Sequence, residues 1–181
     1  MTSSSHEMTT REFIQRLLAP ERAQRVDTFA VFTFSEINDR DTVADIGCGP
    51  GYFTIPLAKA VYNGKLYALD INDEMLEACR RRVEEARLGN VEVLKCGEFE
   101  FPVKEGALNG AFLAFVVQQS PDKPRFLEAV RRLLRPGGGA PFWSGTARRR
   151  RPVRPWSAGW TRTTCGRWPS RPVFSTGLGG T

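Results

Sequence analysis

The chain has 181 residues, of which 41% are hydrophobic, enough to bury the core of one domain of ordinary size. No apolar run is long enough to cross a bilayer, and residues 1–10 lack the apolar segment of a secretory signal, so we expect a cytoplasmic protein. The only histidine is His6 and no two of the four cysteines form a CxxC pair, which argues against a catalytic triad, a zinc site or a disulfide framework.

The formal net charge of +6 comes from the end of the chain. Eight of the 26 basic residues follow Gly138 and no Asp or Glu does, so residues 1–138 hold 18 basic against 20 acidic groups. The part of the chain that can form a core is therefore nearly neutral. We expect neither a nucleic acid nor a membrane as its partner.

The first half of the chain begins with helical patterns and then changes to strand patterns. Thr9 and Glu12 have the spacing of a capping box, which predicts a helix over 10–18, and a second helix is expected over 21–34. The apolar run 42–47 predicts a buried strand. A helix over 53–61, with Pro56 in its first turn, and a strand over 65–70 follow.

The middle of the chain continues this alternation. Asn72 can cap a helix over 73–88, and strands are expected over 91–94 and 110–117. The polar residues Gln118 to Ser120 predict an exposed loop in which Ser120 caps the next helix, over 122–134. Alternating strands and helices predict an α/β fold with a doubly wound, Rossmann-like parallel sheet, whose ligand lies at the carboxyl ends of the strands.

One short motif carries the chemistry. Asp45-Ile-Gly-Cys-Gly-Pro-Gly51 lies between the first strand and its helix, where Gly47 and Gly49 permit a tight turn and close approach of a ligand to the backbone. The glycine spacing does not match the G-x-G-x-x-G of dinucleotide-binding folds. Asp70, at the end of the second strand, can accept hydrogen bonds from both hydroxyls of a ribose.

Residues from Thr42 to Gly138 resemble the class I S-adenosylmethionine-dependent methyltransferases, and most closely their broad UbiE-like small-molecule group. The segment 43–54 resembles motif I of that family, and Asp70 with Glu74-Met75-Leu76 resembles motif II. Residues 111–117 and 133–138 resemble the segments around the fourth strand and before the fifth. The resemblance covers just over half of the chain.

This resemblance implies S-adenosylmethionine as the cofactor. It implies that Gly47, Gly49 and Gly51 wrap the methionine portion and that Asp70 holds the ribose. Residues after the third strand, where Cys96-Gly-Glu-Phe99 replaces the usual Gly-Asp-Ala, stand where the adenine is contacted. The remaining residues expected to line the cofactor are Asp45, Cys48, Ile71, Glu98, Phe99 and Phe115.

The catalytic residue stays open at this point. Methyl transfer is a direct displacement that needs a base only when the acceptor must lose a proton. Tyr52 and Asp27 could approach the cofactor, but both residue types are more often packing or solvent contacts. Many relatives carry an Asp before the fourth strand, where this chain has Asn109, and some have a His after it, where this chain has Gln118 and Gln119.

After Gly138 the composition changes. The tail contains all four tryptophans, five prolines and no Asp, Glu or Lys. With suitable codons, a shift of the reading frame by two nucleotides reads two of its segments as sequences that resemble the family, so we hypothesise a frameshift. The alternative is that Arg148 to Arg151 bind nucleic acid or anionic lipid. A frameshift implies a sheet incomplete after the fourth strand, an exposed edge on that strand, and impaired activity.

The sequence thus predicts three regions: an N-terminal helical segment (1–40), a cofactor-binding methyltransferase core (41–138) and an aberrant, disordered tail (139–181). The predicted function is methyl transfer from S-adenosylmethionine to a small-molecule acceptor, which the sequence does not identify. The alternatives are a non-catalytic cofactor-binding remnant or interaction protein and, against the glycine spacing, an NAD-dependent oxidoreductase.

Overall fold

The computed structural model describes residues 9–21, 37–139 and 142–143. Contacts divide the chain into two units, Met1–Arg151 and Pro152–Thr181, and every described residue belongs to the first. No helix within the described residues is both long enough and apolar enough to cross a membrane. Of the helix predicted over 21–34, the structure describes only residue 21. Asp27 and residues 144–181 of the tail also lie outside the described residues.

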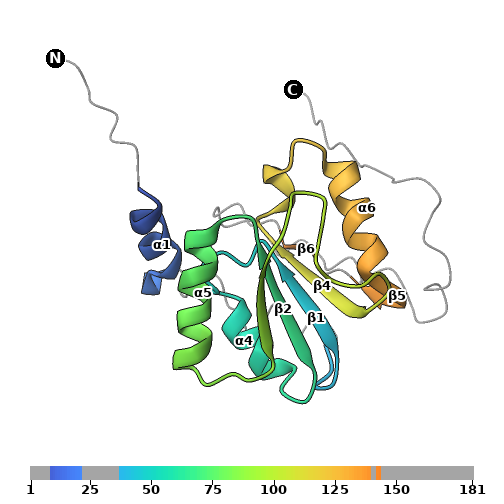
Figure 1. The fold of residues 1–181 in the computed structure, drawn as a ribbon, viewed down its shortest axis with the longest axis horizontal. Coiled ribbons are helices and arrows are strands. Elements are labelled where there is room, and N and C mark those ends of the chain that lie inside the picture. The colour runs from blue at the N-terminus through green and yellow to red at the C-terminus, as the bar shows by residue number, and fades with distance from the viewer. Residues whose placement is uncertain (1–8, 22–36, 140–141, 144–181) are drawn as a thin grey trace, which may run out of the picture. The chain divides into compact units, whose positions relative to one another are not determined.

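The centre of the fold is a parallel sheet with strand order β3-β2-β1-β4-β5 (Figure 1). A further short strand, β6, also pairs with β4 in parallel. The strand bounds are β1 Thr42–Ile46, β2 Lys65–Asp70, β3 Val91–Lys95, β4 Leu108–Ala114, β5 Leu134–Gly139 and β6 Phe142–Trp143.

Helices cover both faces of this sheet, as a doubly wound fold requires (Figure 1). One face packs against α4 (Thr54–Ala60) and α5 (Asp73–Glu85), and the other against α6 (Lys123–Leu133). Neighbouring residues of a strand alternate between faces: Val43 joins the cluster around α4, whereas Ala44 joins the cluster around α6. The predicted α/β Rossmann-like class is confirmed.

Local sequence signals set most helix starts. Thr9 and Glu12 form the predicted capping box of α1 (Thr10–Leu18), with the Thr9 amide donating to Glu12 Oε2 at 2.9 Å and the Glu12 amide to Thr9 Oγ1 at 3.3 Å. Asn72 caps α5 by accepting from the Met75 amide at 3.0 Å. Pro56 lies in the first turn of α4, where its missing N–H removes no helical hydrogen bond.

The structure corrects two predictions around the fourth strand. The strand does not run over 110–117: it ends at Ala114, because Phe115 adopts φ +60°, and Val117–Gln119 form a 3₁₀ turn. The sheet also does not stop there. Leu134–Gly139, predicted as the end of a helix and its stop signal, pairs with β4 as β5, and β6 pairs with Leu113 and Ala114. In the described part of the chain, β4 is therefore not the exposed edge that the sequence predicted.

Candidate functional site

The turn after β1 is built from glycines in the left-handed backbone region. Gly47, Gly49 and Gly51 have φ values of +73°, +54° and +82°. A Cβ on Gly47 would lie 2.7 Å from Val116 Cγ2, and one on Gly51 would lie 2.9 Å from Cys79 Sγ. Both positions therefore exclude a side chain on steric as well as conformational grounds. The turn presents bare backbone at the carboxyl end of the sheet.

Main-chain hydrogen bonds attach this turn to the end of β2. The amides of Gly47 and Cys48 both donate to the carbonyl of Leu69, at 2.8 and 3.0 Å. The amide of Gly51 donates to the carbonyl of Cys48 at 3.1 Å and closes the turn. Because β2 is held between β1 and β3, the sheet itself fixes the position of the turn.

Asp70, the last residue of β2, links the two strand ends that the sequence predicted to hold the ligand. One of its carboxylate oxygens accepts from the Gly49 amide at 2.8 Å, and the other accepts from the Asn72 amide at 2.9 Å. Charge-assisted bonds of this kind are roughly twice as strong as neutral ones. The next residue, Ile71, is 61% exposed and offers an apolar surface beside this carboxylate.

Asp45 lies beneath the turn, inside the core. It is 1% exposed and accepts a hydrogen bond of 2.7 Å from the hydroxyl of Thr54, the first residue of α4. Burial raises the pKa of Asp45 from 3.8 to about 7; the Thr54 hydrogen bond opposes this shift and the negative charge of Asp70 adds to it. Near neutral pH, Asp45 therefore exists in both protonated and ionised forms.

The residues after β3 are held against the segment before α6. The hydroxyl of Ser120 donates to Glu98 Oε1 at 3.3 Å, and the guanidinium of Arg125 lies 4.4 Å from the ring centre of Phe99. Ser120 is buried rather than exposed, so its predicted role as a helix cap is wrong. Asp122 caps α6 instead, by accepting from the Arg125 amide at 3.0 Å.

A strained residue stands at the carboxyl end of β4. Phe115 has φ +60°, which is uncommon for a bulky side chain. The side-chain amide of Gln119 donates to the Phe115 carbonyl at 2.7 Å and supports this backbone. The adjoining Val116 then covers Gly47, so the ends of β1 and β4 fit together at this point.

Four contacts of this site were missed from the sequence: Leu17, Thr54, Val116 and Ser120. Leu17 of α1 is the nearest neighbour of a Cβ built on Gly49, at 3.9 Å. Apolar residues such as Leu17 and Val116 carry no local signal of what they touch. The contact of Thr54 with Asp45 could have been predicted from the sequence. In a strand–turn–helix unit, a hydroxyl nine residues after an Asp can reach back to its carboxylate.

Tyr52, one of the two residues considered as a base from the sequence, takes part in an aromatic contact beside the turn. The Tyr52 ring meets the Phe53 ring edge-on, with centroids 5.0 Å apart, which fits a packing role. In the ranges that the structure describes, no group of three or more His, Cys, Asp or Glu side chains could hold a metal ion.

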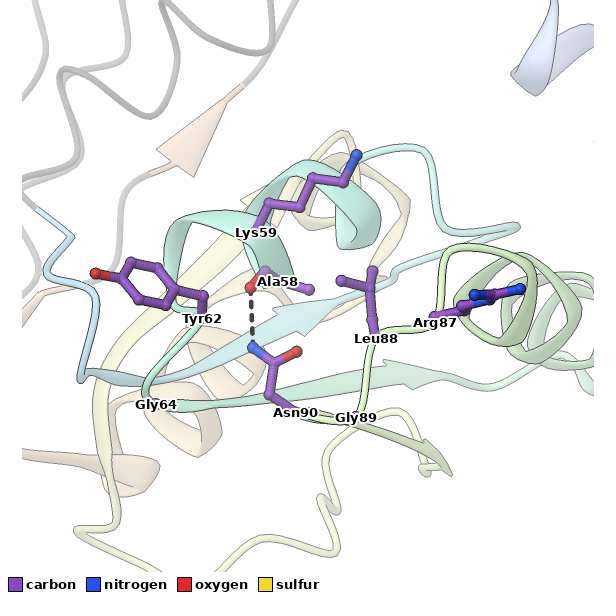
Figure 2. A pocket seen from close by; sticks show the side chains of 8 residues that line it. All are labelled: Ala58, Lys59, Tyr62, Gly64, Arg87, Leu88, Gly89 and Asn90. Carbon is purple, nitrogen blue, oxygen red and sulfur yellow. Dashed lines mark hydrogen bonds between the residues drawn. The ribbon is translucent and has the colours of Figure 1, made fainter.

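A shallow hollow lies at the opposite end of the sheet. Its lining includes Lys59, Tyr62, Gly64, Arg87 and Asn90, which precede β2 and β3 or end α4 and α5 (Figure 2). The side-chain amide of Asn90 donates to the carbonyls of Ala58 and Val61 at 2.9 and 2.8 Å and thereby caps the end of α4. This hollow is thus separate from the glycine turn, and the side chain of Asn90 is committed to the end of α4.

Comparison with known proteins adds to this geometry. Residues 43–138 match a family described as "Methyltransferase domain". An uncharacterized 37.1 kDa transposon protein of Streptomyces fradiae is 36% identical over 57% of this chain and 31% of its own length. A demethylmenaquinone methyltransferase of Bacillus mycoides is 29% identical over 65% of this chain and 48% of its own. The chain thus spans about half or less of these relatives.

A solved structure extends the comparison to the fold. The crystal structure of a SAM-dependent methyltransferase from Aquifex aeolicus matches with a TM-score of 0.71 and 29% identity, over 81% of this chain and 79% of that one. Such neighbours imply S-adenosylmethionine as the cofactor. With more than half of its residues matched, the chain belongs to the methyltransferase domain family and has the fold of S-adenosylmethionine-dependent methyltransferases.

Proposed function

We propose that this chain binds S-adenosylmethionine at the glycine turn and transfers its methyl group to a small-molecule acceptor. One observation carries the proposal: the Asp70 carboxylate bonds to the amides of both Gly49 and Asn72, so it stands between the turns that follow β1 and β2. A ligand with an amino-acid end and a ribose needs bare backbone and a carboxylate at neighbouring strand ends.

The chain's own residues fit this ligand. The glycine turn presents backbone in the left-handed region to the methionine portion, with Val116 and Cys79 packed where side chains at Gly47 and Gly51 would project. Asp70 is the proposed acceptor for the ribose hydroxyls. Ile71, Glu98 and Phe99 form the adenine side, with Glu98 oriented by Ser120. Phe115 directly follows β4 and precedes Val116, which contacts Gly47, so we include it in the lining of the cofactor site.

When bound, the cofactor supplies a methyl group already activated on a sulfonium, and the protein aligns donor and acceptor for direct displacement. Asp45 supports the turn from below and Cys48 contributes backbone to it. The acceptor is proposed to be a small molecule because relatives at 29% identity carry the name demethylmenaquinone methyltransferase. Alignment alone suffices for an acceptor that arrives already deprotonated.

A second candidate is a protein that binds the cofactor without turning it over. The observation in its favour is that the family match ends at residue 138, whereas the chain continues to Thr181 with a different composition. The region boundaries predicted from the sequence, 1–40, 41–138 and 139–181, remain part of this proposal.

Calorimetric titration of the full chain with S-adenosylmethionine and with S-adenosylhomocysteine tests the proposed function. We expect both compounds to bind and NAD not to bind. Incubation with a panel of phenols, quinols and amines, followed by detection of S-adenosylhomocysteine, then separates an enzyme from a binding remnant. Absence of binding to either sulfur compound overturns both candidates, and binding of NAD alone revives the oxidoreductase.

A further inference from the structure

Two cysteines that are far apart in the sequence meet beneath the glycine turn. Cys48 lies between Gly47 and Gly49, and Cys79 lies on α5. They are 6% and 0% exposed, both thiols are free, and both belong to one buried cluster with Ala68, Leu76 and Val83. Each thiol shifts the pKa of the other, as expected for neighbours in one cluster.

This pair touches the parts of the turn that matter for binding. The sulfur of Cys79 occupies the space that a Gly51 Cβ would need, and its S–H donates to the Thr54 hydroxyl at 3.8 Å. The S–H of Cys48 faces the Gly49 carbonyl at 3.5 Å. A covalent bond between the two sulfurs would therefore act directly on the backbone of the turn.

We propose that Cys48 and Cys79 form a disulfide when the protein meets a peroxide, and that this bond switches off cofactor binding. The claim that the bond switches off cofactor binding rests on the proposed function, because it assumes that the turn binds S-adenosylmethionine. The claim that the disulfide forms does not depend on any ligand.

The chemistry balances with hydrogen peroxide as the two-electron oxidant. The thiolate of Cys79 attacks one peroxide oxygen, the O–O bond breaks, and the departing oxygen leaves as water once it is protonated. The sulfur of Cys48 then attacks the resulting sulfenic acid, loses its proton and expels the second water as the S–S bond forms. Two thiols are oxidised and one peroxide is reduced to two waters.

The surroundings of the two thiols support this order. The interaction with Cys48 lowers the pKa of Cys79, whereas the same interaction, together with burial, raises the pKa of Cys48. Cys79 is therefore the thiol of the pair that ionises more readily. Cys96 provides a contrast, since burial raises the pKa of its thiol to about 11.

Disulfide formation changes the turn because the bond has strict geometry. To form the bond, the two sulfurs must approach to about 2.0 Å, with a fixed dihedral angle. A main-chain shift of Cys48 toward α5 would carry the neighbouring amides of Gly47 and Gly49 with it. Those amides are bonded to Leu69 and Asp70, so the movement disturbs the same bonds that shape the proposed cofactor site.

The test uses the full chain in a C165S background, because Cys165 lies outside the described residues. Reduced protein is treated with hydrogen peroxide, digested without reductant and mapped by mass spectrometry. We expect a peptide pair joined through Cys48 and Cys79. Titration with S-adenosylhomocysteine should show affinity at least about tenfold weaker after oxidation, a usual size for coupling between two sites, and full recovery with dithiothreitol.

Matched variants sharpen the result. The C79S variant should show no loss of affinity on peroxide treatment relative to its own untreated state, whereas the C96S variant should respond like the parent. Reciprocity also predicts that bound S-adenosylhomocysteine slows formation of the disulfide. If C79S fails to fold, the peptide map and titration of the parent chain still decide the question.

The outcomes separate the inference from the proposed function. Absence of a joined peptide pair in folded, peroxide-treated protein overturns the inference, and so does a disulfide that leaves the affinity unchanged. Reduced protein that binds no S-adenosylhomocysteine overturns the proposed function and the consequence for affinity, while the peptide map still tests disulfide formation.

Discussion

The two halves of the sheet are built with different regularity. In the first half, which comprises β1, β2 and β3, residues 66–70 pair with 91–95 and residues 42–46 pair with 65–69 without a break. In the second half, which comprises β4, β5 and β6, the pairing of β4 with β5 shifts register between Leu108 and Gly110. Pro136 and Gly137, the latter with φ +83°, interrupt β5 itself.

This difference leads to separate expectations for cofactor binding and for stability. The glycine turn and Asp70 belong to the first half, where a continuous ladder fixes their positions. Phe115 belongs to the second half, where two residue pairs join β5 to β4 and two join β6 to β4. We therefore expect substitutions in the first half to remove cofactor binding, and substitutions in the second half to reduce stability while binding persists.

The largest effect is expected from Gly47→Ala. An alanine must adopt φ +73° and places its Cβ 2.7 Å from Val116 Cγ2. Left-handed strain together with overpacking should lower the free energy of unfolding by about 3–5 kcal/mol and abolish cofactor binding. Urea denaturation and calorimetry measure both.

The matched control is Gly89→Ala, because nothing lies within 4 Å of a Cβ built there. It should change stability by less than about 0.5 kcal/mol. Equal losses in the two variants would show that the turn after β1 is not specially constrained.

The next largest effect concerns Asp45, the buried carboxyl group of β1, and the pH dependence of stability. The folded state raises the pKa of Asp45 from 3.8 to about 7, so between these pH values the folded protein holds a proton that the unfolded chain has lost. Stability contributed by this group is present below pH 4 and is lost as pH rises through 7. Asp45→Asn keeps an oxygen for the Thr54 hydroxyl and removes the titration.

The variant should therefore match the parent near pH 4 and exceed its stability at pH 8 by at most about 4 kcal/mol. Denaturation curves across this pH range measure the difference. Parallel pH profiles for the two proteins would contradict a raised pKa at Asp45.

Asp70→Ala tests the link between the two strand ends. It removes the acceptor of both the Gly49 and the Asn72 amides and the proposed partner of the ribose. Loss of hydrogen bonds to a charged group should weaken S-adenosylhomocysteine binding by about 1.5–3 kcal/mol, roughly 10- to 100-fold. Asp73→Ala is the control, because Asp73 forms only a surface ion pair with Lys95 and should leave affinity unchanged. An unaltered affinity in Asp70→Ala removes the ribose assignment.

The smallest effect is expected in the second half. A Cβ on Gly138 would lie 3.0 Å from the carbonyl oxygens of Arg135 and Asn109 and 3.1 Å from that of Leu108. Because these are backbone atoms, Gly138→Ala should destabilise the protein by about 1–2 kcal/mol by pushing β5 away from β4. Cofactor affinity should stay within about twofold of the parent, less than 0.5 kcal/mol. A loss of binding as large as that of Gly47→Ala would erase the distinction between the two halves.

Local signals in the sequence predicted much of this architecture. The cap at Asn72, the capping box of Thr9 and Glu12 and the strand before the glycine turn all depend on residues within a few positions of one another, and all are present as predicted. The same local rules failed at β5. Proline and glycine rarely favour a strand, and only pairing with β4 makes this segment extended.

The sequence by itself determined most of the elements, the family and the glycine turn, because φ preferences, capping and periodicity act over short stretches of chain. Only the tertiary structure decided which groups meet there: Val116 on Gly47, Ser120 on Glu98, and Cys79 beside Cys48. Those contacts join segments more than twenty residues apart. They exist because parallel strands bring their carboxyl ends to one edge of the sheet, and no short stretch of sequence encodes that convergence.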